Sequence, residues 1–363
     1  MKLPNTRTIY YYLGVIVVLL LTSYVGTRFR HVFASNNDEE YDLIRKYLLT
    51  DNSPLVSDDK PKIWIHTKFE YNARNWQSFQ SRSSMDLNQP YIHITMKSVI
   101  DHCAEDFQVC LIDDNTFAKL LPAWDVDLMS LAEPMKTHVR EIGLAELVYQ
   151  YGGMIVPNSF VCLKNMQEFY RAGLSEERPF VCEKVNRVVN LSKPSRRLTF
   201  MPDSYFLGAP KNSPVLKEYI EYLKERNWSP HFSSDREFGG DSQQWFLKKI
   251  DAQEMNLMGG EMVGVKTNGK KPILVDDLLQ EDYLDISPNC VGIYIPEDEI
   301  LERTKYQWFA VMKTEDILKS GMIISKYMQA SILDSARDYY GKEKRSGKGI
   351  FTKGNAYAQS SSI

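Results

Sequence analysis

The stretch from Lys136 to Met166 constrains the fold more than any other part of the chain. Its first half predicts a helix, because two ionised side chains and several apolar ones recur at the three-and-four spacing of one helical face. These residues are Arg140, Glu141, Leu144, Leu147, Val148 and Tyr151. Gly152-Gly153 ends the helix, since only glycine turns the backbone sharply there without a Cβ penalty. A short strand from Met154 to Val156 follows, and Pro157 ends it because proline has no N–H group.

The segment Pro157-Asn158-Ser159 is the first candidate for a binding site. It directly follows the carboxyl end of a predicted strand. Open α/β sheets bind their ligands at the carboxyl ends of strands. The sequence therefore predicts an α/β fold whose site includes this segment.

The same stretch resembles the signature of the DXD-type glycosyltransferases of GT-A fold, particularly the capsular polysaccharide synthesis and initiating-mannosyltransferase-like groups. Their pattern is S-D-x-x-R, a leucine-rich helix, Y-G-G, an apolar strand, and D-x-D or D-A-T. Glu141 stands where these families have the aspartate, and Tyr151-Gly152-Gly153 matches the pattern. Cys162-Leu163-Lys164 fits the part after the strand, and Ser204 to Pro214 resembles the families' later core strand with its Lys-Asn-x-Pro turn.

The resemblance implies a GT-A-like, Rossmann-type nucleotide-sugar transferase domain. Such an enzyme moves a sugar from a nucleotide-diphosphate donor to a glycan or glycoprotein acceptor, with retention of anomeric configuration. In this chain Asn158 and Ser159 would orient the donor, Glu141 would bond sugar hydroxyls and Arg140 would steady phosphate. The donor-binding candidates are His66, Arg140, Glu141, Gly152, Gly153, Asn158, Ser159, Ser242 and Trp245. No catalytic nucleophile is identified.

Two departures from the family pattern bear on the metal. Leu144 stands where the families have an arginine, and Pro157-Asn158-Ser159 replaces the acidic pair. A hard cation such as Mn²⁺ or Mg²⁺ prefers anionic oxygens, whereas Asn and Ser offer neutral ones. Either the metal is held elsewhere, or the enzyme works without one, or the protein is a catalytically inactive scaffold that binds a glycan or a partner. A structural protein unrelated to sugar chemistry is a third hypothesis.

The run from Phe238 to Trp245 contains the residue that we expect to hold a remaining metal ion, Asp241. In similar transferases a late cluster of acidic, Ser and Trp residues closes over the donor. The alternative is structural: Gly239 to Ser242 would form a turn and N-cap, with Gln243 to Ile250 as its helix. The sequence leaves these two interpretations equally open.

Three other polar positions have a structural interpretation beside a functional one. His66 ends a predicted strand, Lys62 to Thr67, where the families contact the nucleotide base, but a single His is often only a structural hydrogen-bonding residue. Asp113-Asp114-Asn115 follows the strand Phe107 to Ile112, and we expect it to cap the next helix. The literal D-x-D at Asp125 to Asp127 lies in a predicted loop, so we do not assign it to the metal motif.

The amino-terminal segment from Ile9 to Val25 contains no charged residue. As a helix it would be roughly 26 Å long, which suits a thin bilayer, so we expect a membrane anchor, with a cleaved signal peptide as the alternative. The family resemblance implies a type II membrane protein of the endoplasmic reticulum or Golgi with a lumenal domain. The expected organisation is a tail at 1–8, an anchor at 9–25, a stem at 26–60, a domain at 61–335 and a disordered basic tail at 336–363.

Charge and cysteine content limit the remaining possibilities. A net charge of −3 gives no argument for nucleic acid as a partner. The five cysteines have no zinc-type spacing, and three of them lie in predicted strands or cores, which favours buried thiols. We therefore expect no cofactor other than a divalent cation.

Overall fold

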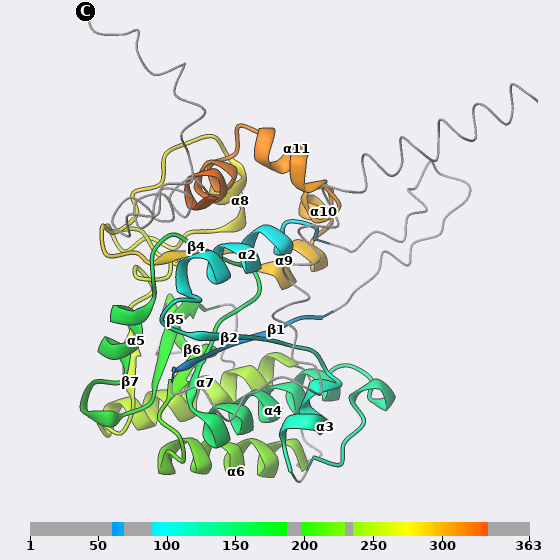
Figure 1. Ribbon diagram of the computed structural model, residues 1–363, viewed down its shortest axis with the longest axis vertical. Helices are drawn as coiled ribbons and strands as arrows, with labels where there is room; N and C mark the ends of the chain where they lie inside the picture. Colours follow the sequence, from blue (N-terminus) through cyan, green and yellow to red (C-terminus); the bar gives the residue numbers. More distant parts are fainter. Residues whose placement is uncertain (1–59, 69–88, 123, 187–197, 229–234, 333–363) are drawn as a thin grey trace, which may run out of the picture. The chain divides into compact units, whose positions relative to one another are not determined.

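The computed structural model describes residues 60–68, 89–122, 124–186, 198–228 and 235–332 (Figure 1). The chain divides into the units Met1–Leu48 and Leu49–Ile363, and all described residues belong to the second. Its centre is a six-stranded sheet with the order β2-β1-β3-β6-β5-β7. The strands are β1 (Lys62–His66), β2 (Gln108–Ile112), β3 (Gly153–Ile155), β5 (Phe180–Val185), β6 (Phe200–Ala209) and β7 (Asn256–Met258).

The sheet is mixed. Strand β1 runs parallel to β2 and β3, and β5 runs parallel to β7, whereas β6 is antiparallel to both β3 and β5. A separate antiparallel pair joins β4 (Phe160–Cys162) to β8 (Gly292–Tyr294). As a result, the carboxyl ends of five strands and the amino end of β6 lie at one edge of the large sheet.

Two groups of helices bury the apolar side chains. Helices α4 (Met135–Tyr151), α6 (Pro214–Trp228) and α7 (Asp235–Asp251) lie together on one side of the sheet (Figure 1). Their core joins sheet residues such as Trp64 and Leu207 to helix residues such as Tyr219 and Phe246. The other helices are α2 (Ile92–Cys103), α3 (Thr116–Leu120), α5 (Gln167–Gly173), α8 (Val275–Leu279), α9 (Glu297–Glu302), α10 (Gln307–Ala310) and α11 (Thr314–Lys319). A second core forms around β4, β8, α2 and the helices from α8 to α11.

The predicted helix, glycine turn and strand are confirmed as α4 and β3. Gly152 and Gly153 have φ of 73° and 97°, in the region that side chains with a Cβ rarely adopt. A Cβ on Gly153 would also lie 2.1 Å from the Lys62 carbonyl oxygen. The turn therefore needs glycine for two reasons, its backbone conformation and the close approach of β1. All five cysteines are buried and none forms a disulfide, as predicted.

A bulge in β6 distorts the edge where the strands end. Val181 of β5 pairs with Leu207, but the next residue, Cys182, pairs with Asp203. The three intervening β6 residues, Ser204 to Phe206, lie opposite no residue of β5. Bulges of this kind redirect side chains and are common next to active sites.

The predicted membrane topology needs correction. Among the helices of the described part, none is long and apolar enough to cross a membrane. The described residues form a mixed α/β domain with a six-stranded sheet. The expectation of a GT-A-like domain behind a transmembrane helix is wrong. The expected location, as a single-pass protein of the endoplasmic reticulum or Golgi, is wrong as well. Residues 9–25, on which that expectation rested, lie outside the described residues, as do residues 26–59 and 336–363. The proposed domain boundaries stay predictions.

Candidate functional site

The candidate site lies where β1, β2 and β3 end. The register pairs His66 with Ile112 and Trp64 with Ile155, so the segments that follow β2 and β3 flank the end of β1. Strand β2 lies on one side of β1 and β3 lies on the other. The connections that follow β2 and β3 therefore leave the end of β1 on opposite sides. Such a reversal of strand order is where open α/β sheets form a ligand-binding crevice.

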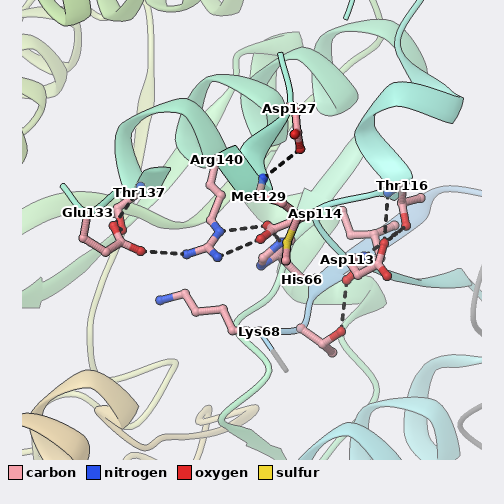
Figure 2. A network of polar contacts seen from close by, with 12 residues as sticks. His66, Lys68, Asp113, Asp114, Thr116, Asp127, Met129, Glu133, Thr137 and Arg140 are labelled. Carbon is pink, nitrogen blue, oxygen red and sulfur yellow. Dashed lines mark hydrogen bonds and ion pairs between the residues drawn. The ribbon is translucent and has the colours of Figure 1, made fainter. Parts of the chain in front are cut away.

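Asp114 is the centre of a polar network at this edge, as Figure 2 shows. Its Oδ1 accepts hydrogen bonds from His66 Nε2 at 2.9 Å and from Arg140 Nε at 2.8 Å. Its Oδ2 accepts one from Arg140 Nη2 at 2.7 Å, so the guanidinium binds the carboxylate through two nitrogens. Arg140 Nη1 also donates to Glu133 Oε1 at 3.3 Å. The network holds the ends of β1 and β2 against the first half of α4.

The network also determines protonation states. Burial alone raises the pKa of the Asp114 carboxyl, but the hydrogen bonds from Arg140 and His66 outweigh it and hold this pKa well below its usual range. Burial lowers the pKa of His66, although the bond to Asp114 opposes this. Since an ionised carboxylate only accepts, neutral His66 carries its proton on Nε2. Near neutral pH the site therefore contains an ionised Asp114, a charged Arg140 and a neutral His66.

The capping prediction for this segment is half right. Asp113 Oδ1 accepts from the Thr116 backbone N–H at 2.9 Å and from the Thr116 hydroxyl at 2.6 Å, so Asp113 caps α3. Asp114 bonds instead to His66 and Arg140. The local pattern identifies a cap, whereas the partners of Asp114 lie far away in the sequence.

A cavity of about 260 Å³ opens beside Asp114. Trp124 forms part of its wall; its ring lies 5.2 Å from that of Phe117, and its Nε1 donates to the Val126 carbonyl at 2.8 Å. A Cβ on Gly143 of α4 would lie 2.9 Å from Phe117 and 3.0 Å from Trp124, so glycine there makes room for both rings. The lining residues are Asp114, Asn115, Ala118, Trp124, Asp125, Val126, Asp127, Leu128 and Met129.

The segment that we set aside as a chance D-x-D thus lines this cavity. Asp127 Oδ1 accepts from the Met129 backbone N–H at 2.9 Å and so caps a short 3-10 helix, Leu128–Ser130. This capping role and the position of the segment beside Asp114 were not expected from the sequence.

Glu141, the neighbour of Arg140 on α4, belongs to a second polar cluster. Its Oε1 accepts from the Ser204 hydroxyl at 2.8 Å and from the Tyr219 hydroxyl at 2.5 Å. Burial raises the pKa of Glu141, and these two hydrogen bonds lower it by less. Ser242 of α7 is buried close to Tyr219. The structure therefore brings Glu141 and Ser242 together, on a different side of α4 from Arg140.

Lys184 and Asp203 continue this cluster along the edge, at the end of β5 and the start of β6. Lys184 Nζ lies 3.7 Å from Asp203 Oδ1, and Gln243 Nε2 of α7 donates to Asp203 Oδ2 at 3.3 Å. The same ammonium lies 5.2 Å from the ring centroid of Tyr205 and 5.7 Å from that of Tyr294. The sequence analysis identified none of these residues as part of the site, because no motif marks them. The pairing of strands and the packing of helices that are distant in the sequence bring them together.

Asn158 and Ser159 lie between the two clusters, at the end of β3. Both are buried, with side chains 6% and 0% exposed respectively. Within the described residues, Asn158 Oδ1 and Ser159 Oγ are buried atoms without a hydrogen-bond partner. Buried polar atoms without a partner are costly, so this segment is a place where a ligand or water would complete the bonding.

Four predicted site residues lie elsewhere. Gly152 directly precedes β3 and Gly153 is its first residue, so both lie at the opposite edge of the sheet from its carboxyl end. Asp241 forms an ion pair with Arg226 of α6. Trp245 packs 5.0 Å from the Tyr219 ring and 6.0 Å from the Tyr222 ring. The structure does not bring these four to the Asp114 network, and their assignment to donor or metal stays a prediction.

The structural alternative for the segment around Asp241, a turn and N-cap, is wrong. Gly239 to Ser242 lie inside α7, which begins at Asp235, so they form neither a turn nor an N-cap. Ser242, Gln243 and Phe246 are buried by this helix. Tertiary packing of that face outweighs the cost of two consecutive glycines in a helix.

The residues at the end of β3 do not fit a divalent cation. Asn158 and Ser159 supply neutral oxygens, and the carboxylate of Asp241 is paired with Arg226. Across the described ranges, no group of three or more His, Cys, Asp or Glu side chains is arranged to hold a metal ion. We therefore derive no chemistry through a metal.

Comparisons with known proteins give a weak likeness to solved structures. No protein-family model matches the chain, and no curated protein matches it either. A solved structure titled PaToxG Glycosyltransferase is similar to it with a TM-score of 0.31 and 9% sequence identity, over 53% of this chain and 70% of that chain. The chain thus has a coarse structural similarity to a glycosyltransferase, and a likeness at this TM-score does not establish a family or a function.

Proposed function

We propose that this protein is a glycosyltransferase that moves a sugar from a nucleotide-diphosphate donor to a glycan or glycoprotein acceptor. The observation that carries the proposal is the Asp114 network with its adjoining cavity, at the carboxyl ends of two neighbouring parallel strands. This is the position at which open α/β sheets bind nucleotides.

The chemistry of the cavity also suits a nucleoside. The Trp124 ring offers a flat apolar face on which a base would stack. Asn115, Asp125 and Asp127 offer oxygens that would accept hydrogen bonds from ribose hydroxyls. With the nucleoside bound here, the diphosphate and sugar would extend past His66 toward Asn158 and Ser159.

Glycosyl transfer places specific demands on this edge. The bond between the anomeric carbon and the diphosphate oxygen breaks, and its electron pair stays on the diphosphate. The acceptor hydroxyl oxygen forms the new bond to the anomeric carbon and releases its proton. Charge therefore grows on the diphosphate while the sugar becomes cationic, and fixed cations and dipoles stabilise that separation. Asn158 Oδ1 and Ser159 Oγ would bind sugar or ribose hydroxyls, which are the partners that buried oxygens require.

A second candidate is a catalytically inactive scaffold that binds a nucleotide, a glycan or a partner protein without turnover. The replacement of the acidic pair by Pro157-Asn158-Ser159 favours it, as does Leu144 in place of the arginine. The two candidates differ in hydrolysis. A transferase slowly hydrolyses its own donor, whereas a scaffold binds it unchanged.

The first experiment is thermal unfolding of the full chain with UDP, GDP, ADP and CDP and their common sugar conjugates, each with Mn²⁺ and with EDTA. A ligand at a hundred times its dissociation constant adds about 2.7 kcal/mol of stability. We expect one nucleotide series to raise the melting temperature, and Trp124→Ala to reduce the rise at the same ligand concentration. If no nucleotide changes the melting temperature, the donor-site proposal is wrong. Release of free sugar from the stabilising conjugate then separates the transferase from the scaffold.

A further inference from the structure

We propose that Cys103 and Cys162 form a disulfide bond when the protein meets a small-molecule disulfide such as oxidised glutathione. The proposal goes beyond the proposed function and does not depend on it. Its starting point is the distance between the two sulfur atoms, which lie 3.9 Å apart. Two thiols already in contact can close to the length of a disulfide bond, about 2.05 Å, through rotation about their side-chain bonds.

The pair connects the end of helix α2 to the end of strand β4. Cys103 is the last residue of α2, Cys162 is the last residue of β4, and both are fully buried. The Ser98 Oγ of α2 accepts a hydrogen bond from the Cys162 N–H at 2.8 Å. One turn earlier, the Thr95 hydroxyl donates to the Asn158 carbonyl. These bonds hold α2 in register with β4, so the two sulfur atoms stay in contact.

The other three cysteines are less suited to a disulfide. All five cysteines lie in the described part of the chain, and within it Cys110 and Cys182 contact no other sulfur atom. Cys290 is the alternative partner of Cys162, because it comes just before β8, which pairs with β4. Its thiol, however, donates to the Gly292 carbonyl at 2.9 Å. The geometry therefore favours the bond between α2 and β4.

The bond would form by two steps of thiol–disulfide exchange. One protein thiolate attacks oxidised glutathione, which gives a mixed disulfide and releases one glutathione thiol. The second protein thiolate attacks the protein sulfur of that mixed disulfide and releases the second glutathione thiol. The two protein thiols lose their protons, and the two electrons that they give up reduce the glutathione disulfide.

Burial makes this exchange slow in the folded protein. Burial, followed by the hydrogen bond with Cys103, raises the pKa of the Cys162 thiol well above its usual range. Few thiolates are then present, and the thiolate is the attacking form. The test must therefore measure an equilibrium and not a rate.

The fold should favour the bond strongly at equilibrium. The two cysteines lie 59 positions apart in the sequence, so their sulfur atoms rarely meet in the unfolded chain. We expect the equilibrium constant for oxidation by glutathione to be about 30- to 900-fold larger in the folded protein than in urea. This ratio corresponds to the usual stabilisation of a fold by a disulfide. The hydrogen bond from Cys162 Sγ to the Lys164 carbonyl, at 3.1 Å, would be lost, which favours the lower part of this range.

The test equilibrates the full chain in glutathione buffers of graded redox potential, begun once with reduced and once with oxidised protein. Alkylation of the free thiols and intact mass measurement count the thiols, and a peptide map identifies the bonded pair. We expect one species that is two hydrogen atoms lighter and carries the Cys103–Cys162 bond. Cys103→Ala should abolish this species, whereas the matched control Cys110→Ala should retain it.

Three results would overturn the proposal. The folded wild type could keep five free thiols in the most oxidising buffer. The map could place the bond between Cys162 and Cys290, in which case Cys290→Ala and not Cys103→Ala would remove it. The equilibrium constant could also be equal in the folded protein and in urea. Should Cys103→Ala not fold, the peptide map of the wild type decides between the two pairings by itself.

Discussion

Two polar clusters share one edge of the sheet and differ in how their charges are bound. In the first, Asp114 accepts three hydrogen bonds of 2.9 Å or less from His66 and Arg140. In the second, Lys184 is held by two aromatic rings and by a carboxylate at 3.7 Å. Saturated bonding makes the first cluster rigid, whereas the second places a lysine beside two aromatic rings at the bulge in β6. We infer that the first cluster shapes the site.

The largest expected effect is the loss of the Asp114 carboxylate. Asp114→Asn should lower the free energy of unfolding by about 3 kcal/mol at neutral pH, because the Arg140 side chain, only 12% exposed, would lose its two-nitrogen ion pair with a carboxylate. The folded pKa of Asp114 is lowered, so its contribution is present above the unfolded value of about 3.9 and is lost as the pH falls through the folded value. Urea unfolding at pH 7 and at pH 3 measures both effects.

The control for this variant is Asp298→Asn. Asp298 is 61% exposed and pairs with Lys68 at 3.5 Å, so its loss should cost less than about 1 kcal/mol. Equal losses of stability from the two variants would contradict the distinction between the clusters.

The next effect concerns ligand binding beside the first cluster. Trp124→Ala should weaken nucleotide binding by about 1 to 3 kcal/mol, the typical cost of losing one aromatic stacking partner. Trp124→Phe should recover most of it. Trp245→Ala is the matched control, since Trp245 packs against Tyr219 and Tyr222 away from the cavity. Calorimetry with the stabilising nucleotide measures all three variants, and a larger loss from Trp245→Ala would place the base elsewhere.

The contribution of Glu141 to stability should depend on pH in the opposite sense from that of Asp114. Its folded pKa is raised by burial, so its contribution is greatest below the unfolded value of about 4.3 and is lost as the pH rises through the folded value. Glu141→Gln keeps an oxygen that accepts from Ser204 and Tyr219. The variant should therefore gain up to about 1 kcal/mol over the wild type at pH 8 and little at pH 4. Unfolding curves at pH 4 and pH 8 measure the gain in the free energy of unfolding. A larger gain at pH 4 than at pH 8 would contradict the prediction.

Local sequence signals predicted the elements around the site well. The helix at Met135–Tyr151 follows from its apolar spacing, and the turn after it follows from two glycines at positive φ. The strand β2 and the cap of α3 by Asp113 are equally local. Asp113 and Asp114 are adjacent and chemically identical, however, so nothing local tells which of them bonds to a distant arginine.

Long-range packing explains the errors. Gly239 to Ser242 reads as a turn, but it is helical because α7 buries Ser242, Gln243 and Phe246 against the rest of the domain. Lys184 and Asp203 meet only through the pairing of β5 with β6 and its three-residue shift. Neither result follows from a pattern of neighbouring residues.

The sequence by itself determined the α4, glycine turn and β3 unit, and with it the edge of the sheet where Asn158 and Ser159 lie, because backbone propensities and side-chain spacing act over a few residues. Only the tertiary structure decided which charges meet at that edge. The parallel pairing of β1 with β2 brings His66 to Asp114, and the bulge in β6 brings Tyr205 to Lys184. Those contacts join residues far apart in the chain, and strand register and packing select them.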